Sequence, residues 1–326
     1  MLFRSLEEAH FPYELDRELN TVGCFDFDGR LTTPMTAHPK VCPTTGELMF
    51  FGYQFMNEPW LTYHRVDAAG NLVQSEQIEI PNPIMMHDFA ITEHYSLFFD
   101  LPIVFSIDDG GFRFKREAGG RIGVMPRAGT NADVKWFEVE PCTVFHSFNA
   151  YERGDEIVLQ VCRASSIMEH GMSDLGDQST PWQWNLDLTT GRATETHLDD
   201  HHGDFPRVDD RLIGQPARYG YMAGLRPGPS PDFTSEIFKY DLDAGTVETH
   251  SFGDEAVHVF EPVFAPAGPD AAEDEGWVVC LTHDDRTDVT TLNVLEAQDF
   301  TADPVARVDL PRRVPFGAHG SWLPAG

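Results

Sequence analysis

The stretch WNLDLTTGRATE, residues 184–195, has the pattern of a β-hairpin. A strand-like run ends at Asp187, a Thr-Thr-Gly turn follows, and a second β-prone run begins at Ala193. Turn residues between β-branched and aromatic residues are typical of two antiparallel strands. The same unit recurs at residues 13–23, 64–75 and 239–253 and, more loosely, at 293–310. Hairpins repeated along a whole chain predict an all-β protein, which is a sandwich, a barrel or a propeller.

The composition supports a globular chain and excludes some classes of function. The 27 glycines and 23 prolines predict many turns between short strands. Acidic residues outnumber basic ones by 53 to 23, and the net charge of −30 repels phosphate backbones. We therefore expect no nucleic-acid partner. The five cysteines are scattered, which suits a reducing compartment better than a disulfide framework.

The sequence also has no apolar run long enough to cross a bilayer, and its first residues lack the apolar region of a secretory signal. We expect a cytoplasmic protein, with peripheral membrane contact as a second option.

The spacing of certain polar residues favours a propeller over the other two architectures. They lie in apolar or proline-flanked settings, at steps of 49, 59, 58, 57 and 58 residues: His38, His87, His146, Asp204, Glu261 and His319. A step of 57 to 59 residues fits one four-stranded blade with its loops, and equivalent positions on successive blades face one central axis. We expect one domain, residues 1–326, with a long loop insertion around residues 111–136.

Four histidines in this series have distinctive contexts: MTAHPKV around His38, IMMHDFAIT around His87, VFHSFNAYE around His146 and GAHGSW around His319. Four neutral imidazoles around one ion suit first-row metals such as iron, copper or zinc. The alternative is that each is an ordinary polar or core histidine, as we expect for most of the 14 histidines of the chain.

At these contexts the sequence resembles the carotenoid cleavage oxygenase family, which includes the retinal pigment epithelium isomerase and stilbene-cleaving dioxygenases. The matching stretches are TAHPKVCPTTGELMFFGY, MMHDFAITEHYSLFFDLP, KWFEVEPCTVFHSFNAYERGDEIVLQVCR and RVPFGAHGSWLP. The four histidine motifs occur in the family's order, and the resemblance extends from about residue 8 to the end of the chain.

The resemblance implies a seven-bladed β-propeller with one non-haem Fe(II) per chain on its axis. His38, His87, His146 and His319 match the family's iron ligands. Three carboxylates match the positions that hydrogen-bond ligand imidazoles in the family: Glu8, Asp204 and Glu261. The family has glutamate where Asp204 stands, in GDFPR, and we expect the shorter side chain to reach its histidine only through a backbone shift or a water.

For function, the resemblance implies a dioxygenase that splits a conjugated carbon–carbon double bond of a carotenoid or apocarotenoid into two carbonyl products. Its partners would be an apolar substrate and O2. A stilbenoid dioxygenase is the first alternative. A truncated, inactive propeller is the second, because the family normally carries a long N-terminal region before the stretch that matches Glu8.

Two apolar stretches are candidates for a substrate or membrane patch. MFFGYQF contributes Phe51, Tyr53 and Phe55, and PNPIMM contributes Ile84, Met85 and Met86. The competing interpretation is that both stretches pack in the core, as aromatic stripes commonly do.

Overall fold

The computed structural model describes residues 3–5, 8, 10–16, 18–174, 178–226, 232–315 and 319–323, with the backbone alone for residues 3–5. Strands dominate these residues, and their helices are four short 3-10 segments: Arg116–Ala118, Asn131–Asp133, Asp210–Leu212 and Ala297–Asp299. The predicted all-β class is confirmed. No helix in these ranges is long and apolar enough to cross a membrane.

The strands form antiparallel sheets that follow one another along the chain. The first three sheets contain β1 (Phe3–Ser5), β2 (Tyr13–Leu15) and β3 (Thr21–Cys24); then β4 (Lys40–Val41), β5 (Leu48–Tyr53), β6 (Leu61–Val66) and β7 (Leu72–Ile78); then β8 (Ala90–Ile91), β9 (Tyr95–Asp100), β12 (Gly120–Pro126) and β13 (Lys135–Val139). A separate hairpin, β10 (Ile103–Ser106) and β11 (Gly111–Phe114), leaves the third sheet between β9 and β12.

The last three sheets repeat the same plan. They contain β14 (Thr143–Arg153), β15 (Glu156–Ala164), β16 (Thr180–Asp187) and β17 (Ala193–His197); then β18 (Gly203–Arg207), β19 (Tyr219–Arg226), β20 (Asp232–Asp241) and β21 (Thr246–Ser251); then β22 (Val257–Val259), β23 (Val263–Pro266), β24 (Gly276–Asp284), β25 (Val289–Glu296) and β26 (Ala306–Asp309).

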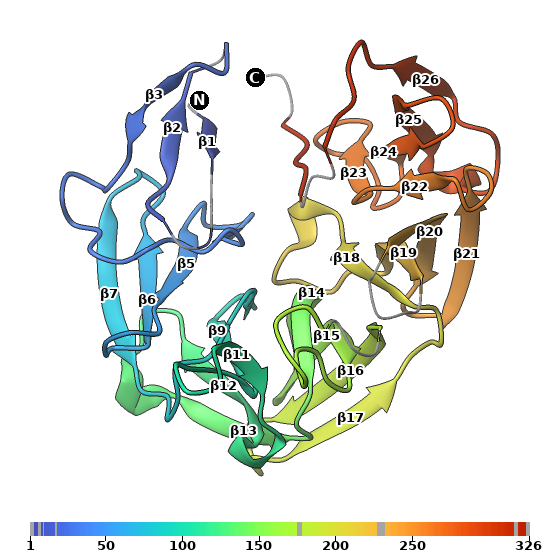
Figure 1. The fold of residues 1–326 in the computed structure, drawn as a ribbon. Coiled ribbons are helices and arrows are strands. Elements are labelled where there is room, and N and C mark those ends of the chain that lie inside the picture. Colours follow the sequence, from blue (N-terminus) through green and yellow to red (C-terminus); the bar gives the residue numbers. More distant parts are fainter. Residues whose placement is uncertain are drawn as a thin grey trace.

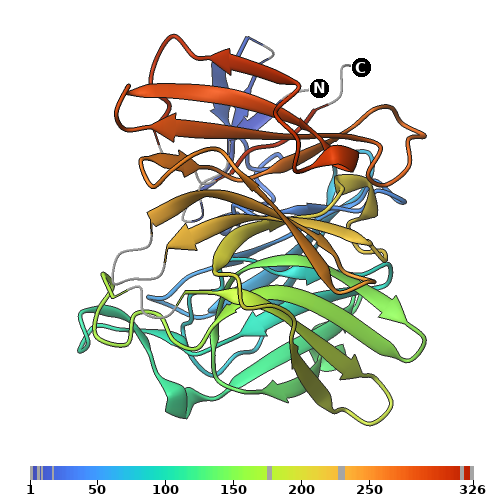
Figure 2. The same ribbon diagram turned by 90° about the vertical axis from the view of Figure 1, so that its right-hand side faces the viewer.

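These sheets are arranged around a common centre (Figure 1). In the sheets of four or five strands, the chain runs from the centre to the rim. The ring is open between the sheet β1–β3 and the sheet β22–β26, which lie at the same end of the molecule (Figures 1 and 2). The described residues therefore form six radial sheets and one extra hairpin. Seven blades in a closed ring stay a prediction.

The hairpins predicted from the sequence are present, and an aspartate shapes several of their turns. In the β16–β17 hairpin, Trp184 pairs with Glu195 and Leu186 with Ala193. Asp187 Oδ1 accepts hydrogen bonds from the backbone N–H groups that follow in the turn, at 2.8 and 2.9 Å. Gly191 then takes a φ of 75°, which a glycine adopts without steric cost. The aspartates of the β6–β7 and β20–β21 turns accept similar bonds.

The expected loop insertion at residues 111–136 is wrong. This range contains β11, β12 and the start of β13, and β12 pairs with both β9 and β13. The glycines that suggest a loop have a packing role instead. Gly123 lies opposite Trp136, and a Cβ at Gly123 would stand 2.7 Å from the Trp136 ring.

The six residues of the expected patch lie in two different places in the structure. Phe51, Ile84 and Met86 are 0, 2 and 1% exposed and belong to the main hydrophobic core, so their assignment to a membrane-facing surface is wrong. The other three patch residues are partly buried and pack against the cluster around β10–β11: Tyr53, Phe55 and Met85. Phe51 lies in β5, whose four central residues are all buried, whereas Ile84 and Met86 lie in the segment between β7 and β8, where Ile84 forms an isolated bridge with Val104.

The core predicts a large effect of one substitution. Trp184 is fully buried in β16, so Trp184→Ala should lower the free energy of unfolding by about 3–5 kcal/mol. Urea unfolding followed by circular dichroism measures this change. Val73→Ala, at a site 43% exposed on β7, is the control and should change the free energy by less than about 0.5 kcal/mol. Equal effects of the two substitutions would contradict the assigned core.

Candidate metal centre

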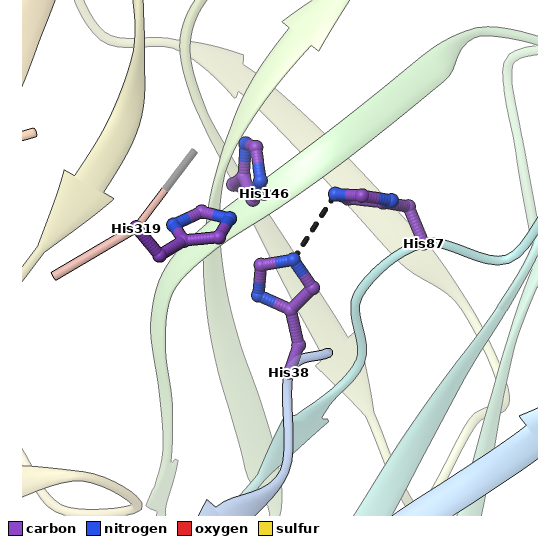
Figure 3. Close-up of side chains that lie close together, drawn as sticks. All are labelled: His38, His87, His146 and His319. Carbon is purple, nitrogen blue, oxygen red and sulfur yellow. Dashed lines mark hydrogen bonds between the residues drawn. The ribbon is translucent and has the colours of Figure 1, made fainter. Parts of the chain in front are cut away.

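Four histidines from distant parts of the chain meet at the centre of the ring. His38 and His87 lie just before β4 and β8, His146 lies in β14, and His319 lies in the segment after β26 (Figure 3). One potential ligand atom from each lies within 4.8 Å of the other three. The Nε2 atoms of His38 and His87 are 3.0 Å apart. The ring centroids of His38 and His319 are separated by 4.4 Å.

A carboxylate holds the outer nitrogen of three of these imidazoles. The contacts join Glu8 Oε1 to His87 Nδ1 at 3.0 Å, Asp204 Oδ1 to His146 Nδ1 at 2.8 Å, and Glu261 Oε1 to His319 Nδ1 at 2.9 Å. An ionised carboxylate accepts, so each Nδ1 carries the proton and donates. This tautomer leaves the Nε2 lone pair directed inward, where a metal ligand needs it.

Asp204 reaches His146 directly, so the expected bridging water is not required. The backbone around it is irregular: the register of the β18–β19 pair shifts between Asp204 and Arg207. Phe205 has a left-handed φ of 57°, and its N–H donates to Asp204 Oδ1 at 2.8 Å. The carboxylate of Asp204 is thus held in place by a hydrogen bond from the backbone N–H of the next residue.

Burial and neighbouring groups shift the pKa values of the centre in different directions. Burial lowers the pKa of His38 well below its ordinary value, and the nearby His146 and His87 lower it further, so His38 is neutral. Burial also lowers the pKa of His87, but the hydrogen bond and charge of Glu8 outweigh this effect and raise it. For Glu261, burial raises the pKa, while the hydrogen bond from His319 and the charge of Arg207 bring the net value below its usual range.

One orphaned nitrogen supports the fit of this donor set to a metal ion. Within the described residues, His146 Nε2 is buried and has no hydrogen-bond partner. His87 Nδ1 contacts Glu8, and its Nε2 lies at hydrogen-bond distance, 3.0 Å, from His38 Nε2. A cation at the centre would be a partner for the lone pair of His146 Nε2 and could take the place of the contact between His38 and His87. Metal–nitrogen bonds of about 2.1 Å place ligand atoms roughly 3–4 Å apart, and all-imidazole donors suit first-row ions.

Two aromatic rings flank the centre, and the sequence reasoning did not single them out. Phe145 packs against His87 with a centroid separation of 5.4 Å. Phe205 packs against His146 at 4.9 Å and His319 at 5.3 Å. The sequence feature that could have identified them is their position: Phe145 directly precedes His146, and Phe205 directly follows Asp204.

Two cavities adjoin the centre. The larger, about 550 Å³, reaches His38, His146 and His319 and has charged walls that include Lys40 and Arg207. The smaller, about 290 Å³, lies beside His319 and is mainly apolar, with lining residues Val263, Leu281, Leu292 and Trp322. The centre is therefore bordered by both a polar and an apolar space.

The comparisons with known proteins agree with this geometry. The family model described as retinal pigment epithelial membrane protein matches residues 3–324. A carotenoid 9,10(9',10')-cleavage dioxygenase 1 from Pisum sativum is 35% identical over 98% of this chain and 64% of its own length. A carotenoid cleavage oxygenase from Mycobacterium tuberculosis is 31% identical over 98% of this chain and 74% of its own length.

Among solved structures, the lignostilbene dioxygenase of Pseudomonas brassicacearum superposes with a TM-score of 0.89 and 28% identity, covering 99% of this chain and 73% of that chain. The chain thus spans 64% of the length of the plant relative and about three quarters of the bacterial ones.

Removal of one imidazole should abolish metal uptake. His87→Ala deletes one of the four nitrogens that lie within 4.8 Å of one another, the one 3.0 Å from His38 Nε2. Elemental analysis after anaerobic incubation with Fe(II) and desalting should give one ion per wild-type chain and none for the variant. His201→Ala, on a surface loop beside Asp199, is the control and should retain the ion. Stoichiometric iron in His87→Ala would exclude the four-histidine site.

Removal of the charge on a supporting carboxylate should weaken metal binding without abolishing it. Glu261→Gln keeps the shape of the side chain but loses the charge that orients His319, so the metal dissociation constant should rise roughly 10- to 100-fold. Competition with a chelator measures this constant. Glu47→Gln, which breaks an ion pair with Arg65 in the second sheet, should leave it unchanged. An unchanged constant in Glu261→Gln would show that this carboxylate does not support the centre.

Proposed function

The chain belongs to the family of the retinal pigment epithelial membrane protein and the carotenoid cleavage oxygenases, and on that premise we propose that it is an iron(II)-dependent dioxygenase that cleaves a conjugated carbon–carbon double bond. The observation that carries the proposal is the convergence of four imidazoles, three of them hydrogen-bonded to carboxylates. Relatives named as carotenoid cleavage dioxygenases and a neighbour named as a lignostilbene dioxygenase support this reaction class.

His38, His87, His146 and His319 would hold the iron, one ion per chain. When bound, iron(II) with neutral ligands supplies dioxygen activation at its open coordination positions. Glu8, Asp204 and Glu261 fix the tautomers of His87, His146 and His319, so each of these three rings presents a lone pair rather than an N–H to the centre. The protein also carries the negative charge needed to balance a divalent ion without placing a carboxylate among its direct ligands.

The remaining task of the protein is to place the substrate and exclude water. The rings of Phe145 and Phe205 border the imidazoles and present apolar faces to which a planar conjugated chain can stack. Both atoms of O2 enter the two carbonyl products, so the reaction consumes and releases no proton. An acid–base pair is unnecessary, and orientation of one double bond beside the metal supplies the selectivity.

A carotenoid or apocarotenoid is the proposed substrate class. The relatives with this name cover almost the whole chain, and the apolar cavity beside His319 is compatible with a hydrocarbon chain. A stilbenoid is the second candidate, favoured by the close superposition with the lignostilbene dioxygenase. Both substrates have a conjugated double bond flanked by apolar groups and differ in the polarity of their ends.

Substrate assays separate these candidates. The protein is loaded with iron(II) without oxygen, and O2 is then admitted with an apocarotenal or with a hydroxylated stilbene. We expect loss of the polyene absorbance and two carbonyl products, each labelled from ¹⁸O₂ at its new carbonyl. His146→Ala is the inactive control. Cleavage of the stilbene alone would select the second candidate, and cleavage of neither by iron-loaded protein would contradict both.

A further inference from the structure

A buried polar network lies directly beside three of the four histidines in the chain. Lys40 follows His38 by two residues, Asp88 follows His87, and Ser147 follows His146. The ammonium of Lys40 lies 2.7 Å from Asp88 Oδ1. The N–H and the hydroxyl of Ser147 donate to Asp88 Oδ2 at 2.9 and 2.7 Å. One carboxylate thus joins segments of three different sheets.

Both oxygens of the Asp88 carboxylate have hydrogen-bond partners. Besides the three contacts above, the N–H of Phe89 donates to Asp88 Oδ1 at 2.8 Å. The side chain of Asp88 is only 2% exposed, and that of Lys40 is 17% exposed. The ammonium of Lys40 supplies a compensating charge at hydrogen-bond distance from this buried carboxylate. The network is therefore a satisfied buried ion pair.

Such a network is poorly explained by stability alone. Moving two charges out of water costs free energy that their mutual attraction often fails to recover, whereas a fully bonded buried pair fixes one arrangement of its partners. The segments that carry His38, His87 and His146 therefore gain a defined separation from Asp88.

Four further hydrogen bonds connect the ligand histidines and their neighbours to other segments. The N–H of His38 donates to Thr36 Oγ1 at 3.0 Å, and this hydroxyl donates to the carbonyl of His87 at 3.3 Å. On the other side of the centre, Arg207 donates to Glu261 Oε2 at 3.2 Å and to the carbonyl of Gly320 at 2.8 Å. The fourth histidine is thus fixed by a separate cation–carboxylate pair.

We propose that Lys40, Asp88 and Ser147 are positioning residues that set the spacing of His38, His87 and His146 and, through it, the coordination geometry and affinity of the metal ion. The proposal rests on the metal-binding function proposed above. The three residues act through the histidines: Asp88 bonds to Lys40 and to Ser147, and these contacts hold the three segments that carry His38, His87 and His146 at a fixed separation.

Cobalt(II) binding tests this role, because the visible absorption of cobalt depends on its coordination geometry and can be read without turnover. In Asp88→Asn and Lys40→Met, the cobalt dissociation constant should rise roughly 10- to 100-fold, as for other groups that orient ligands. The visible bands should also change in position or intensity. Lys40→Arg keeps the ion pair and should restore values close to wild type.

A matched control separates positioning from general stability. Asp100 forms another buried ion pair, 2.7 Å from Arg121, in the third sheet, and no ligand histidine adjoins it in sequence. Asp100→Asn should lower the melting temperature of the metal-free protein while leaving the cobalt spectrum and dissociation constant at wild-type values. Ser147→Ala is a milder variant in case Asp88→Asn does not fold. It removes one hydrogen bond to a charged group and should raise the constant about three- to tenfold.

The outcomes distinguish this inference from the proposed function. If wild-type protein binds no cobalt, the metal centre itself is wrong, and the positioning role falls with it. If wild-type protein binds one cobalt and the Asp88, Lys40 and Ser147 variants share its spectrum and dissociation constant, the positioning role alone is overturned. A changed spectrum in Asp100→Asn as well would assign the effect to general loss of stability and would also overturn it.

Discussion

The hydrogen bonds from three imidazoles to three carboxylates are the interaction on which the rest of the centre depends. Four histidines with ligand atoms within 4.8 Å of one another cannot all be cations, because their charges would repel in a buried site. As neutral groups they satisfy one another only in part: His38 Nε2 and His87 Nε2 are at hydrogen-bond distance, 3.0 Å, while within the described residues His146 Nε2 has no partner. The carboxylates resolve the conflict by binding the outer N–H groups and by supplying charge that favours a cation at the centre.

Two of these three hydrogen bonds follow the repeat of about 58 residues along the chain. Each sheet begins near the centre, runs to the rim and returns, so one residue at the start of each inner strand faces the axis. The partners His146 and Asp204, and likewise Glu261 and His319, are each 58 residues apart. In these two pairs a carboxylate reaches the histidine of an adjacent repeat, whereas Glu8 and His87 are 79 residues apart.

Local sequence rules predicted the hairpins and the ring of inward residues well, because both depend on short-range chemistry or on a regular period. An aspartate followed by glycine stabilises a turn in any sheet, as Asp187 and Gly191 show. The errors arose where tertiary packing reverses a local preference. Gly123 resembles a loop residue in the sequence, but it makes room for the ring of Trp136 across the strand pair. Ile84 and Met86 resemble a surface patch, but neighbouring sheets cover them.

The Lys40–Asp88 pair and the aromatic rings at the centre were harder to predict for a different reason. Their roles depend on which segments meet in space, and hydrophobic periodicity carries no information about that. The sequence placed them next to the histidines without showing that Asp88 and Ser147, 59 residues apart, share a hydrogen bond. In a repeating ring, the residue after an inward position is itself brought near its counterpart on the next sheet, so such neighbours are natural candidates for cross-sheet ties.

The segment that carries His319 shows how the site and the fold are coupled. Its described residues, 319–323, come after β26 and belong to no strand, so a backbone ladder does not hold them. Hydrogen bonds that hold them include the Glu261 contacts to His319 Nδ1 and to the N–H of Gly320, and the bond from Arg207 to the Gly320 carbonyl. An ion shared by His319 and the three histidines of the other sheets would connect this segment to the far side of the ring opening. Because a ligand that binds only the folded state stabilises it, metal binding would strengthen the ring at the place where its hydrogen-bonded sheets leave it open.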